Sequence, residues 1–389
     1  MRVCIVSFKE CWQDAEGCWT SYGGFPAQMK AISSLFDETD LVICSGRPRE
    51  GGMPLPAAAR IVALRNPPGR GLRRKLAVLA KFPYYVGEIR RHVRAADAVH
   101  VPVPGDIALL GLLMALLYRK PLVARFCGSW RVQGRQTLAN RFTRAIMSRF
   151  AGGRNVMLAT GLADDPPSER MHWIFSTAMS RDEVQALRPE LDRGLSDRPR
   201  AIFAGRLAQP KGVDHLIRAL AKLRKEGFTP LPHLTVVGDG PERAHLMKMA
   251  KAKGLSELIE FTGQLDRRRL SERMMQADFC LHGSLTEGLC KAWLDSMAHG
   301  LPVVAYAAGA APAVLGEDGE RGWLAPVGDV DALARRIRSV ISEPRDWPAL
   351  RRRCRAYAEE RTLESWSVVI GELCAAAWGV TLEEGRLTA

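Results

Sequence analysis

The chain alternates short apolar runs with helical segments along its whole length, and this alternation restricts the fold more than any other feature. In the second half, strands are expected at 200–204, 233–237, 258–261, 278–282 and 302–305, each followed by a helix. In the first half, strands are expected at 2–8, 40–44, 60–64, 98–103, 121–126 and 154–159. Helices are expected between them at 25–36, 72–94, 106–118 and 136–150. Such alternation produces parallel sheets with helices on both faces, so the sequence predicts an α/β fold with doubly wound parallel sheets.

The length of 389 residues exceeds one ordinary domain and fits two of about 190 residues. A segment rich in Pro, Gly and charged residues at 188–199 is expected to link them. The first domain is therefore expected to span 1–190, completed by a terminal helix over 364–380, and the second to span 199–363.

The composition, 47% hydrophobic and 25% charged, is typical of a soluble globular protein. The N-terminal MRVCIVSF is expected to be a strand and not a signal peptide, and the apolar run 107–117 is too short to cross a bilayer. The nine cysteines form no CxxC pair and no Cys/His cluster, so we expect reduced thiols, a cytoplasmic location and no metal site.

Positive charge is concentrated in residues 51–150, which carry 18 basic and 3 acidic side chains. Its densest part, 69–94, interleaves Arg and Lys with Leu, Phe and Tyr. Such a segment can bind nucleic acid, rest on an anionic membrane surface, or simply solvate a helix. Because no known nucleic-acid-binding fold accompanies it, nucleic acid is not expected as a partner. Peripheral association with the inner face of a membrane and a plain solvated helix both stay open.

The segment FAGRLAQPKG, from Phe203 to Gly212, places charge where a strand passes into a helix. A buried strand end is followed by Arg206, and Pro210 and Lys211 then open an amphipathic helix. Parallel sheets bind ligands at this edge, and an arginine fork with a lysine point charge suits a diphosphate. Taken alone, the segment can also be a solvated Arg206 and a helix-capping Lys211.

A second segment, EGLCKAWLDSMAHGLPVVA over 287–305, combines two acids with a loop-to-helix junction. Glu287 precedes a helix expected over 290–299, and Asp295 lies about two turns along it. An acid in the loop can accept hydrogen bonds from a sugar, and an acid on the helix can hold the two hydroxyls of a ribose. The free N–H groups from Gly288 to Cys290 are expected to face an anion.

These motifs and their order resemble those of retaining GT-B glycosyltransferases of the family 4 type, also called glycosyl transferases group 1. That family carries GRL-x4-KG, VVGDGPE and Glu-x7-Glu segments, and this chain has GRLAQPKG (205–212), VVGDGPER (236–243) and the segment 287–305. The stretch 307–337 is also similar to the family. Two departures stand out, because Asp295 replaces the usual second Glu, and Ala308, Gly309 and Ala313 replace the usual GG and PE residues.

The resemblance implies two Rossmann-like domains that face each other across a cleft. It implies Arg206, Lys211 and Glu287 as catalytic residues, with Arg206 and Lys211 on the donor diphosphate and Glu287 toward the donor sugar. The other donor-binding residues that it implies are Gly24, Gly205, Gly238, Gly288, Leu289, Cys290 and Asp295, the last on the ribose. It further implies transfer from a nucleotide-diphosphate sugar to a glycan, lipid-linked or small-molecule hydroxyl, as in polysaccharide biosynthesis, with retention and without metal or other cofactor.

The first half matches the family less well. Gly24 precedes a helix, where the family has a glycine pair, and its small size would admit a donor phosphate. Trp12 and Trp19 lie in an expected loop over 8–22, where they either stack on a sugar or lipid or pack on their own domain. Cys127 stands where the family often has a histidine. His100 and Arg125 are therefore further acceptor-side candidates, with a core role as the alternative for each.

Two other function classes were compared with this one. A nicotinamide oxidoreductase is disfavoured because the first βα turn lacks GxGxxG, and Gly238-x-Gly240 is followed by no third glycine. A pseudoenzyme of the same fold, which binds a glycan or nucleotide without turnover, is the alternative that stays open. The pair Asp329 and Asp331 is interpreted as a helix cap and not a metal site. For an active transferase, closure of the two domains about hinges at 188–199 and 361–366 is expected to exclude water.

Overall fold

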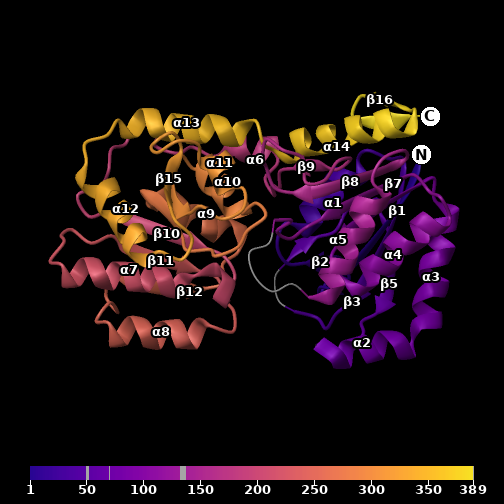
Figure 1. The fold of residues 1–389 in the computed structure, drawn as a ribbon, viewed down its shortest axis with the longest axis horizontal. Coiled ribbons are helices and arrows are strands. Elements are labelled where there is room, and N and C mark those ends of the chain that lie inside the picture. Colours follow the sequence, from indigo (N-terminus) through magenta and orange to yellow (C-terminus); the bar gives the residue numbers. More distant parts are fainter. Residues whose placement is uncertain (50–51, 70, 132–136, 389) are drawn as a thin grey trace. The chain divides into compact units, whose positions relative to one another are not determined.

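The structure, a computed structural model, describes residues 1–49, 52–69, 71–131 and 137–388. The chain divides into two compact units (Figure 1): the first comprises Met1–Ala178 and Leu363–Ala389, and the second comprises Met179–Thr362. The boundary thus falls earlier than the expected linker 188–199, which belongs to the second unit. Hydrogen bonds explain this, because Arg193 donates to the carbonyl oxygen of Ala277 at 2.6 Å and Ser196 donates to the Asp278 carboxylate at 2.8 Å.

The first unit contains seventeen helices and strands within the described residues. In chain order they are β1 (Arg2–Gln13), β2 (Trp19–Ser21), α1 (Phe25–Ser33), β3 (Glu38–Ser45), β4 (Met53–Pro54), β5 (Arg60–Arg65), α2 (Gly71–Ala80), α3 (Phe82–Ala95), β6 (Ala98–Val103), α4 (Asp106–Leu117), β7 (Leu122–Phe126), α5 (Leu138–Phe150), β8 (Asn155–Thr160), β9 (His172–Ile174), α14 (Leu363–Trp378), β16 (Thr381–Glu383) and β17 (Arg386–Thr388).

The main sheet of the first unit is parallel, with neighbouring strands in the order β5-β3-β1-β6-β7-β8-β9. The chain builds outward from β1 to β3 and β5 on one side, then returns to β6 on the other. The topological switch point therefore lies between β1 and β6, where doubly wound sheets form their ligand crevices. The short strands β2 and β4 add an antiparallel extension to the end of β1.

Two differences from the sequence-based prediction concern the first unit. The expected loop 8–22 is instead a continuation of β1 to Gln13 followed by β2, after a register shift between Val6 and Glu10. The expected helix 72–94 is two helices, α2 and α3, because Pro83 lacks an N–H and is tolerated only in a first helical turn. The helix expected from residue 136 begins at Leu138, and residue 136 lies outside the described part of the chain.

The core of the first unit consists of two clusters, one on each face of its sheet. Alternate residues of β1 belong to different clusters, as the two-residue period of a strand requires: Cys4 and Val6 to one, Val3 and Ile5 to the other. Helices α3, α4 and α5 contribute to the first cluster, and α1 and α14 to the second. The C-terminal helix α14 is thereby part of the first unit, through the fully buried Trp366.

The second unit repeats the architecture with a six-stranded parallel sheet. Its elements are α6 (Arg181–Ala186), β10 (Arg200–Ala204), the 3₁₀ turn η1 (Gln209–Lys211), α7 (Val213–Lys225), β11 (His233–Val237), α8 (Arg243–Ala252), β12 (Ile259–Gly263), α9 (Arg267–Gln276), β13 (Phe279–His282), α10 (Lys291–Ala298), β14 (Val303–Tyr306), α11 (Ala311–Leu315), β15 (Gly322–Ala325), α12 (Val330–Ser342) and α13 (Trp347–Glu359). The strand order is β12-β11-β10-β13-β14-β15. Its switch point lies between β10 and β13.

Together the two units confirm the predicted α/β class with two doubly wound, Rossmann-like sheets. Among the helices of the described residues, none combines the length and apolar character needed to cross a membrane.

Candidate active site

The predicted site of the second unit lies at its switch point. Lys211 ends η1, just after β10, and Glu287 lies in the loop after β13, so the two residues come from neighbouring strands 76 positions apart in the sequence. The Lys211 ammonium donates a hydrogen bond to the Glu287 carboxylate and forms an ion pair with it. The Glu287 side chain is 9% exposed and that of Lys211 is 28% exposed. The structure thus joins two predicted catalytic residues in one partly desolvated pair.

The electrostatics of this pair favour its charged form. Burial by itself lowers the pKa of Lys211, but the Cys290 sulfur and the Glu287 carboxylate raise it, and the net shift is upward. Burial raises the pKa of the Cys290 thiol, so that neutral thiol contributes little and Glu287 is the effective counter-ion. One carboxylate oxygen of Glu287 takes the lysine, which leaves the other able to accept a hydrogen bond from a ligand.

Arg206 occupies a different environment in the same edge of the sheet. It follows β10 by two residues and is exposed, and its guanidinium has no hydrogen-bond or ion-pair partner among the described residues. A guanidinium that makes no ion pair with a described residue can approach an anion at this edge without first breaking such a pair.

Four loops of this edge approach one another through glycines. Gly212 has φ +58°, and a Cβ there would lie 1.8 Å from the carbonyl oxygen of Gly283. Gly238 has φ +135°, and its Cβ would lie 1.9 Å from the carbonyl oxygen of Gly205. Only glycine meets both demands, a left-handed backbone and contact with a neighbouring chain. The loops after β10, β11 and β13 therefore interlock by backbone contact, which fixes the position of Lys211.

The loop that carries Glu287 is held in the same way from the side of β14. A Cβ at Gly309 would lie 1.9 Å from the Glu287 carbonyl oxygen, and Ala310 donates its N–H to the carbonyl of Gly288 at 3.0 Å. Leu289 and Cys290 are buried, and Cys290 is the N-cap residue of α10. Their side chains support the loop from within, so a ligand would meet backbone at these positions.

Asp295, predicted to hold a ribose, lines a cavity of about 540 Å³ between α6, α9 and α10. Its Oδ1 atom is buried and has no hydrogen-bond partner within the described residues. Burial raises the pKa of this carboxyl group. The cavity is otherwise largely apolar, with Leu270, Met274 and Met275 along α9. An unsatisfied carboxylate oxygen is costly to the protein alone and suits a ligand hydroxyl.

Of the two alternatives left open for Trp12 and Trp19, the structure favours packing on their own unit, and both residues lie on strands and not in a loop. Trp12 lies on β1 and is only 2% exposed, packed against Tyr22 with ring centroids 4.7 Å apart. Trp19 lies on β2, is partly buried, and packs against the second core cluster. The hairpin-like return of β2 along β1 buries Trp12 and partly buries Trp19, so both indoles pack on their own unit, and Trp12 also borders a cavity of that unit.

His100 and Arg125 are core residues, which corrects their assignment as acceptor-side candidates. Burial and the Arg125 charge lower the pKa of His100 to about 3, so its fully buried ring stays neutral. Arg125 is 3% exposed, donates to the Gln28 side chain at 2.9 Å and lies 5.1 Å from the centre of the Trp366 ring. Gln28 and Trp366 come from α1 and α14, so this arginine holds two helices on the sheet, and neither side chain reaches solvent.

Cys127 and Gly24 are accessible, as their proposed roles require. Cys127 directly follows β7 and is exposed, with its thiol donating to the Arg125 carbonyl at 3.5 Å. Gly24 is the N-cap of α1, with an ordinary φ of −76°. Its neighbour Gly23 carries the positive φ, +77°, so Gly23 is the residue whose backbone conformation requires glycine at this turn.

Several residues of the site were missed by sequence reasoning. Gly212 and Gly309 were part of recognised motifs and Gly283 was not, and the backbone contacts of all three join segments that are far apart in the sequence. The Ser284 hydroxyl, two positions past β13, is buried without a partner among the described residues, and no local pattern marks it. The interpretation of Asp329 as a helix cap agrees with the structure, because its carboxylate accepts the Ala332 N–H at 2.8 Å.

Comparison with known proteins now adds to this geometry. The glycosyl transferases group 1 family matches residues 192–361, which is most of the second unit. The second unit thus contains a glycosyl transferases group 1 domain. Within the family match lie Arg206, Lys211, Glu287 and Asp295, together with all of the glycine contacts described above.

Curated relatives of this group 1 glycosyltransferase include alpha-D-kanosaminyltransferase of Streptomyces kanamyceticus, 28% identical over 66% of this chain and 70% of the relative. Another is the GDP-mannose-dependent alpha-(1-6)-phosphatidylinositol monomannoside mannosyltransferase of Mycolicibacterium smegmatis, 33% identical over 54% of this chain and 53% of the relative. The chain thus matches between about half and 70% of the length of these relatives.

Solved structures extend the likeness to both units. Anabaena HepE in complex with UDP-glucose has a TM-score of 0.70 at 18% identity, covering 97% of this chain and 99% of that one. Sucrose-phosphate synthase from Thermosynechococcus elongatus has a TM-score of 0.73 at 16% identity, with coverage of 97% and 99%. At such identities the likeness concerns the fold, and the group 1 glycosyltransferase has the GT-B fold that its sequence predicted. Membership of family 4 stays a prediction.

Proposed function

We propose that this protein transfers a sugar from a nucleotide-diphosphate donor to a hydroxyl acceptor, with retention at the anomeric carbon and without a metal ion. The observation that carries the proposal is the Lys211–Glu287 pair at the switch point, at the same sheet edge as Arg206, whose guanidinium is unpaired among the described residues. Cations at the carboxyl edge of a parallel sheet suit a diphosphate, and a carboxylate next to them suits the hydroxyls of the sugar that the diphosphate carries.

The two cations would act on the charge that develops when the donor breaks. As the bond between the anomeric carbon and the phosphate oxygen cleaves, negative charge grows on the diphosphate. Arg206 and Lys211 would stabilise that charge, and because the glycine contacts fix the loop beforehand, little reorganisation is needed at that moment. The acceptor oxygen bonds to the anomeric carbon on the same face, and its proton passes to the departing phosphate oxygen.

The two acids would hold the donor at either end. Glu287 would accept hydrogen bonds from hydroxyls of the donor sugar with the oxygen that does not take Lys211. Asp295 would accept from ribose hydroxyls through its unsatisfied Oδ1 atom. Asp295 is one methylene shorter than the glutamate usual in the family, so the ribose is expected to lie slightly closer to α10.

The acceptor is proposed to be a glycan, a lipid-linked sugar or a small molecule, and helix α2 favours a membrane-associated one. No residue of α2 is buried, and three of its leucines, Leu72, Leu76 and Leu79, are 58–72% exposed among exposed Arg73 and Lys75. An apolar stripe flanked by cations is typical of a helix at an anionic lipid surface. Arg70, within the basic segment 69–94, lies outside the described residues. Closure of the two units around the donor stays a prediction.

The experiment that tests the proposed function is a donor panel. Purified protein is incubated with UDP-, GDP- and ADP-sugars, with and without mixed glycan acceptors, and nucleotide release is followed together with the anomeric configuration of any product. We expect release with one donor class, faster with acceptor, and an axial or equatorial linkage that matches the donor. Tight nucleotide binding without release from any donor would instead support the pseudoenzyme, and an inverted product would contradict retention.

A further inference from the structure

The end of β1 contains an irregularity that reshapes the crevice of the first unit. Val6 pairs with Val42 of β3, but the next ladder pair is Glu10 with Cys44, so β1 has more residues than β3 between the two pairs. The Lys9 N–H, which leaves the ladder there, donates to the Ser7 hydroxyl at 3.1 Å. Bulges of this kind re-aim side chains next to functional sites. Here the bulge presents Phe8 and Lys9 at the switch point of the sheet.

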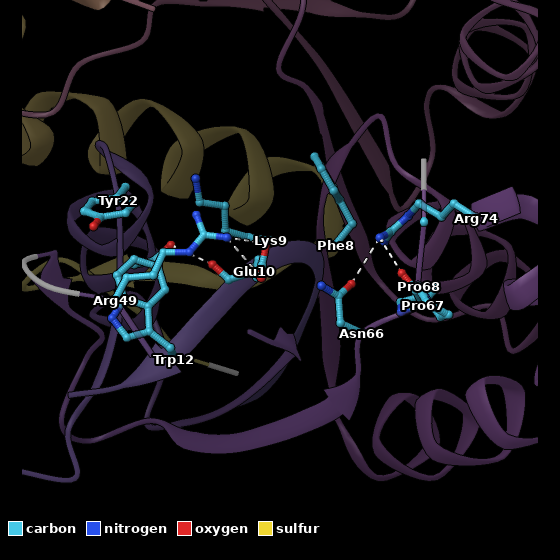
Figure 2. Close-up of a pocket in the computed structure, with 12 residues that line it drawn as sticks. Phe8, Lys9, Glu10, Trp12, Tyr22, Arg49, Asn66, Pro67, Pro68 and Arg74 are labelled. Atoms are coloured by element: carbon cyan, nitrogen blue, oxygen red, sulfur yellow. Dashed lines mark hydrogen bonds and ion pairs between the residues drawn. The ribbon is translucent and has the colours of Figure 1, made fainter. Parts of the chain in front are cut away.

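The residues of the bulge line a cavity of about 540 Å³, within the range of small-molecule sites. Its walls come from β1, from β2 and from the segments that follow β3 and β5, together with α2 (Figure 2). All of these elements belong to the first unit, and β1, β3 and β5 are parallel strands whose carboxyl ends lie at the same edge of the sheet. The cavity therefore lies at the carboxyl edge of the sheet, on the β3 and β5 side of β1, in the unit that does not carry the Lys211–Glu287 pair.

Three cations line this cavity in the described part of the chain, and they differ in what holds them. Arg74 forms a bidentate pair with Asp106, at 2.6 and 3.1 Å, and also donates to Asn66 and to the Pro67 carbonyl (Figure 2). Arg49 lies 3.4 Å from Glu10 and over the Trp12 ring. Arg74 is therefore held in place by several hydrogen bonds as part of the cavity wall, whereas Arg49 is held by a long, exposed ion pair and its contact with the Trp12 ring.

Lys9 is the cation without a counter-ion. It is partly buried, and its ammonium makes no hydrogen bond or ion pair with any described residue. Burial lowers the pKa of Lys9, against the opposing effect of Cys11 and Glu10. A partly desolvated and unpaired ammonium costs free energy in the empty protein, and an anionic ligand group would relieve that cost.

The remaining walls suit a sugar ring. Phe8 is 43% exposed and Tyr22 is partly buried, and both border the cavity beside the Lys9 side chain. Their rings offer apolar faces, while the Glu10 carboxylate offers an acceptor for hydroxyl groups. Glu10 is itself placed by Gly46, where a Cβ would lie 2.5 Å from the Glu10 Cγ atom.

We propose that this cavity binds the acceptor, and that the acceptor is a sugar bearing a negatively charged group, phosphate or carboxylate, which pairs with Lys9 and Arg49. The inference rests on the proposed function, because it assigns the second substrate of the same transfer. Phe8 and Tyr22 pack against the sugar ring, and Glu10 accepts from its hydroxyls.

The test measures binding of three probes to the full chain by calorimetry: glucose 1-phosphate, glucuronate and glucose. Saturating UDP or GDP, whichever binds, is present to occupy the diphosphate site of the second unit. We expect a charged probe to bind and glucose to bind far more weakly. The phosphate and carboxylate arms then identify which anion the cavity prefers. Lys9→Met should weaken the charged probe about 10- to 100-fold, the range for a lost charge-assisted hydrogen bond.

Two further variants serve as a control and as a second test of the cavity. Lys30→Met removes an exposed lysine of α1 that lies outside this cavity, and it should leave probe affinity unchanged. Arg49→Gln changes an exposed residue, so the variant should fold even if Lys9→Met does not. It should weaken binding of the charged probe and so provides a second test of the cavity. Equal binding of glucose and the charged probes, binding of neither charged probe, or unchanged affinity in both cavity variants would overturn the inference.

The same preparations separate this inference from the proposed function. Hydrolysis of the donor to water needs no acceptor. A protein that hydrolyses a nucleotide sugar but binds neither charged probe contradicts only the acceptor assignment. A protein that binds a charged probe through Lys9 but turns over no donor contradicts only the transferase.

Discussion

The two units have parallel sheets with the same kind of strand order, yet different parts of the chain form their ligand-binding edges: backbone in the second unit and side chains in the first. In the second unit the loops after β10, β11, β13 and β14 touch through glycine backbone, and the partly buried Lys211–Glu287 ion pair joins the loops after β10 and β13. In the first unit the corresponding edge is opened by a bulge and lined by aromatic and charged side chains. Backbone contacts hold a constant chemical group such as a diphosphate, whereas side chains can be exchanged to suit a variable acceptor.

The largest effect is expected from removing the cations of the second unit. Arg206→Ala or Lys211→Ala should lower kcat/KM for transfer, with a rise of about 2–4 kcal/mol in the activation free energy. This is the scale for loss of a charged group that stabilises a transition state. Lys225→Ala, an exposed residue of α7, is the control and should leave kcat/KM unchanged. Wild-type kinetics in both site variants would sink the diphosphate assignment.

The backbone interlock can be tested by adding a single methyl group. Gly212→Ala should lower the free energy of unfolding by about 3 kcal/mol, because its Cβ would meet the Gly283 carbonyl in a left-handed backbone. Gly227, with φ +71° and open space around it, is the matched control, and Gly23 of the first unit, with φ +77°, is its counterpart. Alanine at either should cost about 1 kcal/mol. Urea unfolding measures all three, and equal costs would show that the close approach contributes nothing.

The first unit, and not the second, should carry the surface that associates with anionic lipid. The double variant Arg73→Gln, Lys75→Gln should make the free energy of partitioning onto phosphatidylglycerol vesicles less favourable by about 2 kcal/mol, roughly 1 kcal/mol for each cation. Lys248→Gln with Lys251→Gln on α8 of the second unit removes the same charge and should have no effect. Vesicle sedimentation at low salt gives the answer. Absence of wild-type binding, or equal loss in both double variants, would contradict a membrane face on α2.

Asp295 should show opposite effects on binding and on stability. Asp295→Asn should weaken nucleotide binding about tenfold, through loss of a charged acceptor for the ribose. Burial raises the pKa of Asp295, so the folded state holds this proton more tightly than the unfolded chain does. Ionisation therefore costs stability as pH rises above the unfolded pKa, and the neutral Asn should raise the free energy of unfolding at pH 7. Calorimetry and thermal melts measure the two effects, and tighter nucleotide binding by the variant would refute the ribose role.

The smallest expected effect is the pH dependence of the free energy of unfolding that one buried histidine in each unit contributes, and it should be equal in the two units. His100 and His282 lie in the first and second sheets, and burial lowers the pKa of each to about 3. Each ring stays neutral when folded but takes up a proton near pH 6.5 when unfolded, so its contribution is complete above that pH and is lost on acidification. From pH 6.5 to 5.5 each should cost about 1 kcal/mol. His100→Gln and His282→Gln should flatten the pH dependence of unfolding by similar amounts, and an unchanged slope in both would contradict this.

Much of the fold was predictable because strands and helices depend on local periodicity. The strands and helices expected on both sides of each switch point are present, and Pro83 explains the break between α2 and α3. The charged residues of the second unit were also predictable, since they occur in compact motifs next to strand ends. Their partners within the first unit were not: Arg125 has the same local context as a ligand-binding arginine, but its side chain meets Gln28, 97 positions away.

The sequence by itself determined two doubly wound sheets, the edge at which sheets of this kind bind ligands, and the residues that carry charge at that edge of the second sheet. The tertiary structure alone decided that Lys211 pairs with Glu287, that His100 and Arg125 are buried, and that Lys9 faces a cavity with no counter-ion from the described part of the chain. The reason is physical: local periodicity fixes which backbone a segment adopts, whereas burial and pairing depend on segments that meet only after the sheet has assembled. The sequence analysis placed Lys9 in an expected loop over 8–22, and only the structure shows that it lies on β1, at a bulge against β3.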